Sequence, residues 1–97
     1  MNVGEFRATV AGDAPPAGVS LALQTLWWDA KGDWHRAHAC AQQDEGRTGS
    51  AVHAYLHRKE GDMHNAAGWY RRAGRDPATV SLEQEWQALA EEMLGRV

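Results

Sequence analysis

Two histidines and a glutamate in the middle of the chain carry the donor atoms of a metal site. His57 follows His53 by four residues, and Glu60 follows His57 by three. Residues three or four apart on a helix lie on the same side, so both imidazoles and the carboxylate would face one ion. Two neutral imidazoles and a carboxylate are a valid ligand set for zinc, iron or nickel. The spacing therefore predicts a candidate site for a divalent transition metal at His53, His57 and Glu60.

This ligand set is incomplete, and a non-metal interpretation stays open beside it. No cofactor is required by the sequence, and a further metal ligand would have to come from another segment. The candidates for that ligand are Asp29, Asp33, His35, His38 and His64. The zinc-protease motif is absent, because Ala54 stands where that motif needs a glutamate. Alternatively, the same groups could transfer protons without a metal, or simply pack between helices and hydrogen-bond to carboxylates.

A second group combines a tryptophan with arginines. Trp69 and Arg72 lie on one predicted helix with other basic residues close by: Arg58, Arg71 and Arg75. Arginine beside tryptophan could hold an anion, a peptide carboxylate or a base. The alternative is a solvated basic face that pairs with the acidic residues of the segment 83–92.

The step Trp27-Trp28-Asp29 indicates a contact surface. Adjacent residues on a helix point about 100° apart, so the two indoles cannot fill the same core. Trp27 fits an apolar stripe, which directs Trp28 toward another element, a pocket or a partner chain. We therefore predict that Trp28, Asp29, Trp69 and Arg72 contribute to ligand or partner binding. A homodimer or a protein partner would cover the open helical faces.

The elements that position these residues are predicted to be helices. Apolar residues recur at steps of three and four through most of the chain, and no alternating pattern indicates a strand. The fold class is therefore all-α, with about five helices in two antiparallel helix–turn–helix units plus a C-terminal helix. Residues 1–12 are expected to be weakly structured, and residues 13–97 to form a single helical domain.

Turn and capping residues mark the expected helix ends. Asp13, before two prolines, is a candidate helix start, and Thr48 or Ser50 is a candidate cap for the helix that carries the histidines. Ser81 with Gln84 three residues later predicts a capping box at the start of the last helix.

An internal repeat relates the two predicted hairpins. The hexapeptide GDWHRA at 32–37 recurs as GDMHNA at 61–66, an offset of 29 residues. Glycine permits a left-handed exit from the first helix, and the following aspartate caps the second. The second copy, with Ala66, Tyr70, Ala73 and Pro77, resembles the tetratricopeptide repeat.

The resemblance to tetratricopeptide repeats covers roughly half the chain, with departures. That family has a period of about 34 residues, and Ala41 stands in the first unit where Tyr70 stands in the second. The resemblance implies antiparallel hairpins that often form a protein-binding scaffold, and it implies no catalysis. The segment 53–74 also resembles small uncharacterised bacterial proteins, to which we attach no activity.

Size and charge narrow the classes of function. The chain has 97 residues and a formal net charge of −3, so no basic field indicates nucleic-acid binding. A single cysteine, Cys40, is typical of a reducing compartment, and neither a secretory signal nor an apolar run of about 18 residues is found. We therefore expect a cytoplasmic protein with no membrane partner.

Two hypotheses follow from the sequence. The first is an interaction module, without enzymatic activity, that self-associates or binds a protein partner. The alternative is a small metal- or ligand-binding protein, a class that includes enzymes, with the His/Glu cluster as its site.

Overall fold

The computed structural model describes residues 1–95 and is helical throughout. Within these residues it has six α-helices and one 3₁₀ turn, and it has no strand, which confirms the predicted all-α class. The elements are α1 (Val3–Ala8), η1 (Thr9–Ala11), α2 (Leu21–Ala30), α3 (Trp34–Gln43), α4 (Arg47–Lys59), α5 (Met63–Ala73) and α6 (Leu82–Leu94). No helix in this part of the chain has both the length and the apolar character needed to cross a membrane.

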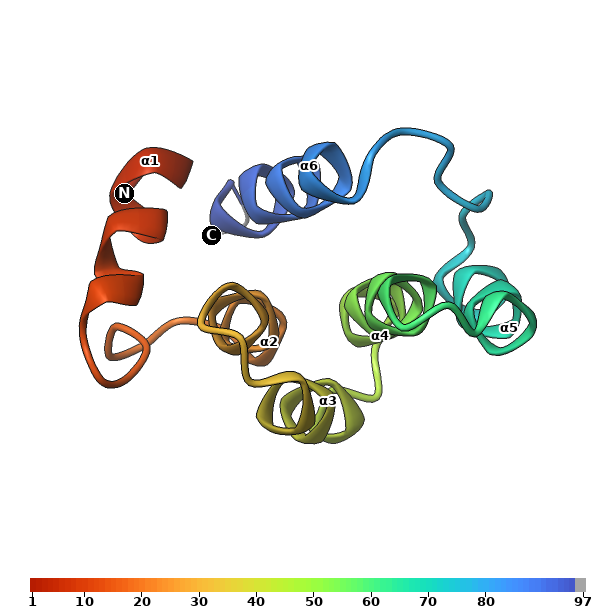
Figure 1. Cartoon of the computed structure of the whole chain (residues 1–97), viewed down its shortest axis with the longest axis horizontal. Coiled ribbons are helices and arrows are strands. Elements are labelled where there is room, and N and C mark those ends of the chain that lie inside the picture. Colours follow the sequence, from red (N-terminus) through yellow and green to blue (C-terminus); the bar gives the residue numbers. More distant parts are fainter. Residues whose placement is uncertain (96–97) are drawn as a thin grey trace.

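Two helical hairpins, α2–α3 and α4–α5, form the body of the domain (Figure 1). Both turns use the repeated Gly-Asp step: Gly32 has φ 90° and Gly61 has φ 89°. The carboxylates of Asp33 and Asp62 each accept a hydrogen bond from the backbone three residues further on, which caps α3 and α5. The repeat therefore corresponds to two similar turns, as the sequence predicts.

Helix α6 packs across the hairpins and completes the core. It contacts α2 and α4 on the side away from α3 and α5, and α1 lies beside it (Figure 1). Trp86 of α6 is buried, and its indole N–H donates to the carbonyl oxygen of Leu26 on α2 at 2.9 Å. Trp27 and Leu56 are fully buried in the same core. The apolar faces of both hairpins thus meet a helix of their own chain.

The expectation of a weakly structured N-terminal segment is corrected by α1. Asn2 and Glu5 form a reciprocal capping box at the start of this helix. Phe6 is fully buried, and its ring stacks against Trp86 with a centroid distance of 6.1 Å. The short segment is ordered because one aromatic side chain, Phe6, reaches the core.

Two predicted helix starts are also corrected. Helix α2 begins after Ser20 rather than at Asp13, and the Ser20 side chain accepts from the N–H of Leu23. Helix α4 begins after Gly46, and the Thr48 hydroxyl donates to Asp44 instead of capping the helix. Proline and threonine side chains fit several turn positions, so local sequence does not rank these alternatives.

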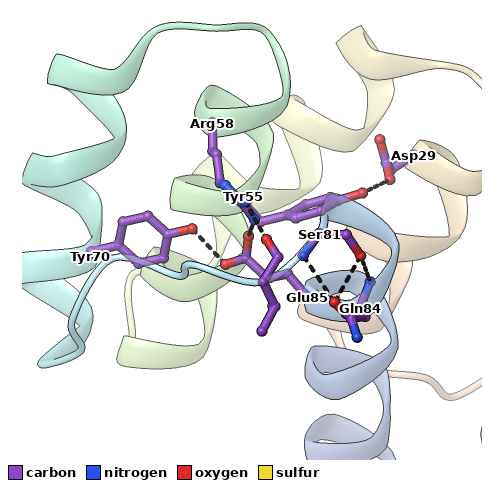
Figure 2. A network of polar contacts seen from close by, with 8 residues as sticks. Asp29, Tyr55, Arg58, Tyr70, Ser81, Gln84 and Glu85 are labelled. Atoms are coloured by element: carbon purple, nitrogen blue, oxygen red, sulfur yellow. Dashed lines mark hydrogen bonds and ion pairs between the residues drawn. The ribbon is translucent and has the colours of Figure 1, made fainter.

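A buried carboxylate joins α6 to the second hairpin. Glu85 is 6% exposed and accepts from Arg58 Nη1 at 2.8 Å and from the Tyr70 hydroxyl at 2.5 Å (Figure 2). Ser81 and Gln84 form the predicted capping box one turn earlier. Part of the predicted basic face therefore pairs with the acidic helix, as Arg75 also does with Glu92.

The left-handed backbone at Gly61 makes substitution there costly. We expect Gly61→Val to lower the free energy of unfolding by about 1–3 kcal/mol, because a β-branched residue is strained at positive φ. Gly68→Ala on α5 is the control, since an added Cβ there meets no atom within 4 Å. Alanine at this helical site should be neutral or stabilising. Urea denaturation measures both, and an unchanged Gly61→Val protein would contradict the expectation.

Candidate metal centre

Three histidine side chains from α3 and α4 meet between these two helices. His38 of α3 and His53 of α4 lie with their Nε2 atoms 2.9 Å apart. One ring nitrogen of each of His38, His53 and His57 lies within 4.8 Å of the others. Such a group could hold a metal ion.

Glu60 does not share this group with His53. Its Oε1 lies 2.7 Å from Nδ1 of His57, and within residues 1–95 it groups with His57 and Asp62 instead. When Nδ1 of His57 donates to this carboxylate, the lone pair of the ring is on Nε2. The distance from Nε2 to Nδ2 of Asn65 is 3.5 Å, which is long for a hydrogen bond. A carboxylate that fixes the tautomer of a metal-binding histidine is a common outer-shell arrangement. The geometry therefore makes Glu60 an orienting group for His57.

Two tryptophans enclose the histidines. Trp69 stacks on His53 with ring centroids 3.7 Å apart, and Trp34 stacks on His38 at 4.8 Å. The Trp34 indole N–H donates to the carbonyl oxygen of Leu56 at 3.1 Å, which fixes that ring. His53 and His57 are 3% and 6% exposed. The aromatic walls thus restrict both ring rotation and access of water to the imidazoles.

Burial keeps two of the imidazoles neutral. It lowers the pKa of His53 to about 4, with smaller contributions from His38, His57 and Arg72. Burial also lowers the pKa of His38, again reinforced by His57. Neutral imidazole is the form that binds a metal.

The metal-free protein should lose stability as the pH falls from about 6.5 to 4. In this interval the unfolded chain protonates His53, whose ordinary pKa is 6.5, whereas the folded chain keeps it neutral. His53 then contributes a slope of up to about 1.4 kcal/mol per pH unit. Urea denaturation in the presence of a chelator measures the slope, and His53→Gln should flatten it. Equal slopes in the two proteins would contradict the assignment.

The predicted ligand residues Trp69 and Arg72 lie beside this cluster. The Arg72 guanidinium lies over the Trp69 ring at 4.5 Å from its centroid. Both residues line a cavity of about 290 Å³ together with His53. The structure therefore brings together two candidate groups that the sequence treats separately.

The other two predicted binding residues lie elsewhere. Asp29 is buried, where it accepts from the Tyr55 hydroxyl at 2.8 Å (Figure 2). It also accepts from Lys59 Nζ at 2.8 Å. Trp28 is half-buried, edge-on to Trp27, with the Arg36 guanidinium 4.6 Å from its ring centroid. Asp29 thus serves internal packing, and Trp28 is partly covered by its own chain.

The sequence named His38 only as one of several further ligands. Asp29, Asp33, His35 and His64 join no group of potential ligands within residues 1–95. What selects His38 is the crossing of α3 against α4, which its position in the repeat does not reveal. The nearby Trp34, four residues earlier on the same helix face, is the one local signal that could have favoured it.

Comparison of the chain with protein-family models, curated proteins and solved structures found no match. The likeness to tetratricopeptide repeats therefore stays a prediction, and any function must be inferred from the site itself.

Proposed function

We propose that this domain binds a divalent transition metal through His38, His53 and His57, with Glu60 orienting His57. The observation that carries the proposal is the approach of three buried or half-buried imidazoles from two helices. Exposed histidines on one helix would be common without a metal, whereas here two helices bring three imidazole nitrogens within 4.8 Å of one another. This proposal is the alternative hypothesis of the sequence, with His38 in place of Glu60 as third ligand.

The spacing of the His38 and His53 nitrogens is compatible with a zinc-sized ion. Zinc–nitrogen bonds of about 2.0–2.1 Å at tetrahedral angles separate two ligand nitrogens by about 3.3 Å. The Nε2 atoms of His38 and His53 are 2.9 Å apart while they share a hydrogen bond. Binding would replace that hydrogen bond and widen the pair by a few tenths of an ångström. Three imidazoles without thiolate suit zinc, copper or nickel.

The metal would have a defined role in the fold. It would join α3 to α4 across the loop between the hairpins, and it would leave a fourth position for water or another ligand. A bound zinc ion would supply Lewis acidity at that position. The interaction-module hypothesis draws less support, because α6 covers the inner face of the hairpins and Trp28 is half-buried.

Metal titration of a tag-free protein tests the proposal. The chelator-treated chain should take up one equivalent of Zn²⁺ in titration calorimetry and should show a higher melting temperature when loaded. Copper(II) should also quench tryptophan fluorescence, since Trp69 stacks directly on His53. Absence of uptake for zinc, copper and nickel would refute the proposal and leave the histidines as packing residues.

A further inference from the structure

We infer that a small organic cation that donates N–H groups binds in the cavity between the end of α3, the start of α4 and the last turns of α5. Alkylguanidinium and alkylammonium ions belong to this class. The cavity has a volume of about 290 Å³, which limits its occupant to a small molecule. The inference does not depend on the proposed metal, because it concerns polar atoms of the metal-free chain.

A buried hydroxyl without a partner lies in the wall of this cavity. Ser50 is 4% exposed, and within residues 1–95 its hydroxyl makes no hydrogen bond. The other buried polar side chains, among them Thr25 and Glu85, all have partners. No fully buried polar side-chain atom in the described part of the chain lacks a partner, so the small exposed area of Ser50 includes Oγ. The hydroxyl is therefore open to the cavity and can accept from a ligand.

His53 presents a second unpartnered atom to the cavity. Its Nε2 lies 2.9 Å from Nε2 of His38, and among the described residues Nδ1 makes no hydrogen bond. The residue lines the cavity and is 3% exposed, so the argument made for Ser50 applies to Nδ1 as well. When Nε2 of His53 donates to His38, Nδ1 carries the lone pair and accepts from an N–H group.

Carboxylates outnumber basic groups in the cavity lining. Asp44 and Glu45 both belong to it, and Arg72 is its one basic residue within residues 1–95. The Trp69 ring lies between the Arg72 guanidinium, 4.5 Å from its centroid, and the His53 ring, 3.7 Å from it. The positive charge is thus kept away from the unpartnered nitrogen of His53, and the balance of charge favours a cation over an anion.

The helix ends around the cavity add to this preference. Helices α3 and α5 both reach it with their last turns, through Gln42 and Arg72, and helix C-termini attract cations. The opposing N-terminus of α4 is offset by Asp44, whose carboxylate accepts from the N–H of Gly46 at 3.0 Å and from the Thr48 hydroxyl at 2.8 Å. These bonds use one lone pair of each carboxylate oxygen, so Asp44 can also accept from a ligand.

Titration of the chelator-treated protein with methylguanidinium tests the inference. Its guanidinium group is weakly hydrated and matches the geometry of a carboxylate. We expect saturable shifts in ¹H–¹⁵N spectra at the amides of Glu45 and Ser50 and at the indole of Trp69. N-methylurea has the same arrangement of heavy atoms but no charge, so it should bind about tenfold more weakly. Equal binding of the two probes, or shifts that avoid the cavity lining, would refute the inference.

Three variants and a control locate the binding. Ser50→Ala should weaken methylguanidinium binding by about 2–10-fold, and it should fold like the parent protein because alanine favours helices and the lost hydroxyl has no partner. Glu45→Gln should weaken it by about threefold, and Arg72→Gln should strengthen it, since one removes an attractive and the other a repulsive charge. Glu91→Gln makes the same change of charge on an exposed residue of α6 outside the lining, and should have no effect.

The variants also decide against the inference if they fail to discriminate. Unchanged binding in both Ser50→Ala and Glu45→Gln would contradict it, and so would weaker binding in Arg72→Gln. Because the titration uses metal-free protein, a failure of zinc to bind would not alter its result.

Discussion

Replacing His38 with glutamine should weaken Zn²⁺ binding on the order of 100-fold or more. The variant removes one of the three imidazoles that we propose as ligands, and the remaining two lie on a single helix. Glutamine approximates the size of the half-buried ring, so α3 and α4 should keep their packing. Titration calorimetry at constant pH measures the effect, and circular dichroism checks that the helix content is unchanged.

His38 belongs to the site proposed from the structure but not to the trio predicted from the sequence, which has Glu60 instead. Variants at these two positions therefore tell the two sites apart. Glu60→Gln should cost only about 10–100-fold in affinity, because this carboxylate orients His57 rather than binding the ion. The other two histidines, His35 and His64, are exposed and provide matched controls, since glutamine at either should leave the affinity unchanged. If the His38 variant kept its full affinity for Zn²⁺ and the Glu60 variant lost all of it, the ligands would be His53, His57 and Glu60 instead.

Glu85→Ala should lower the free energy of unfolding by about 3–5 kcal/mol. The change leaves the largely buried Arg58 guanidinium without its carboxylate and deprives the Tyr70 hydroxyl of its acceptor (Figure 2). It also weakens the attachment of α6 to the second hairpin, because Glu85 is the acceptor that joins Arg58 and Tyr70 to this helix. Urea denaturation gives the stability, and hydrogen exchange along α6 locates the loss.

Glu83 on the same helix is the matched control for Glu85. It pairs with Arg7 at the surface, and the two side chains are 67% and 42% exposed. Glu83→Ala should therefore change the stability by less than about 1 kcal/mol. Replacing both Arg58 and Glu85 by apolar residues should recover much of the loss, since no charge is then left buried. Equal effects of Glu83→Ala and Glu85→Ala would contradict the proposed role of the buried pair.

Much of the helical framework is predictable from short-range rules. Asp33 and Asp62 cap α3 and α5 by accepting from the backbone N–H three residues further on, and Ser81 forms its capping box over the same span. Glycine at 32 and 61 ends each first helix with a positive φ. These features depend on residues within one turn, which the sequence displays directly.

The first helix shows where such rules fail. Asn2 and Glu5 carry a capping signal, but a helix of six residues is not stable alone. It persists because Phe6 reaches Trp86, which lies eighty residues further along the chain. Only the tertiary packing of α6 supplies that contact.

The sequence by itself determined the candidate metal-binding chemistry at His53 and His57, because residues four apart on a helix share one face. The tertiary structure decided the rest. The packing of α3 against α4 places His38 beside His53, and the short reach of Glu60 directs its carboxylate to Nδ1 of His57. A helix fixes neighbours within one turn, whereas contacts between helices depend on how their whole surfaces pack.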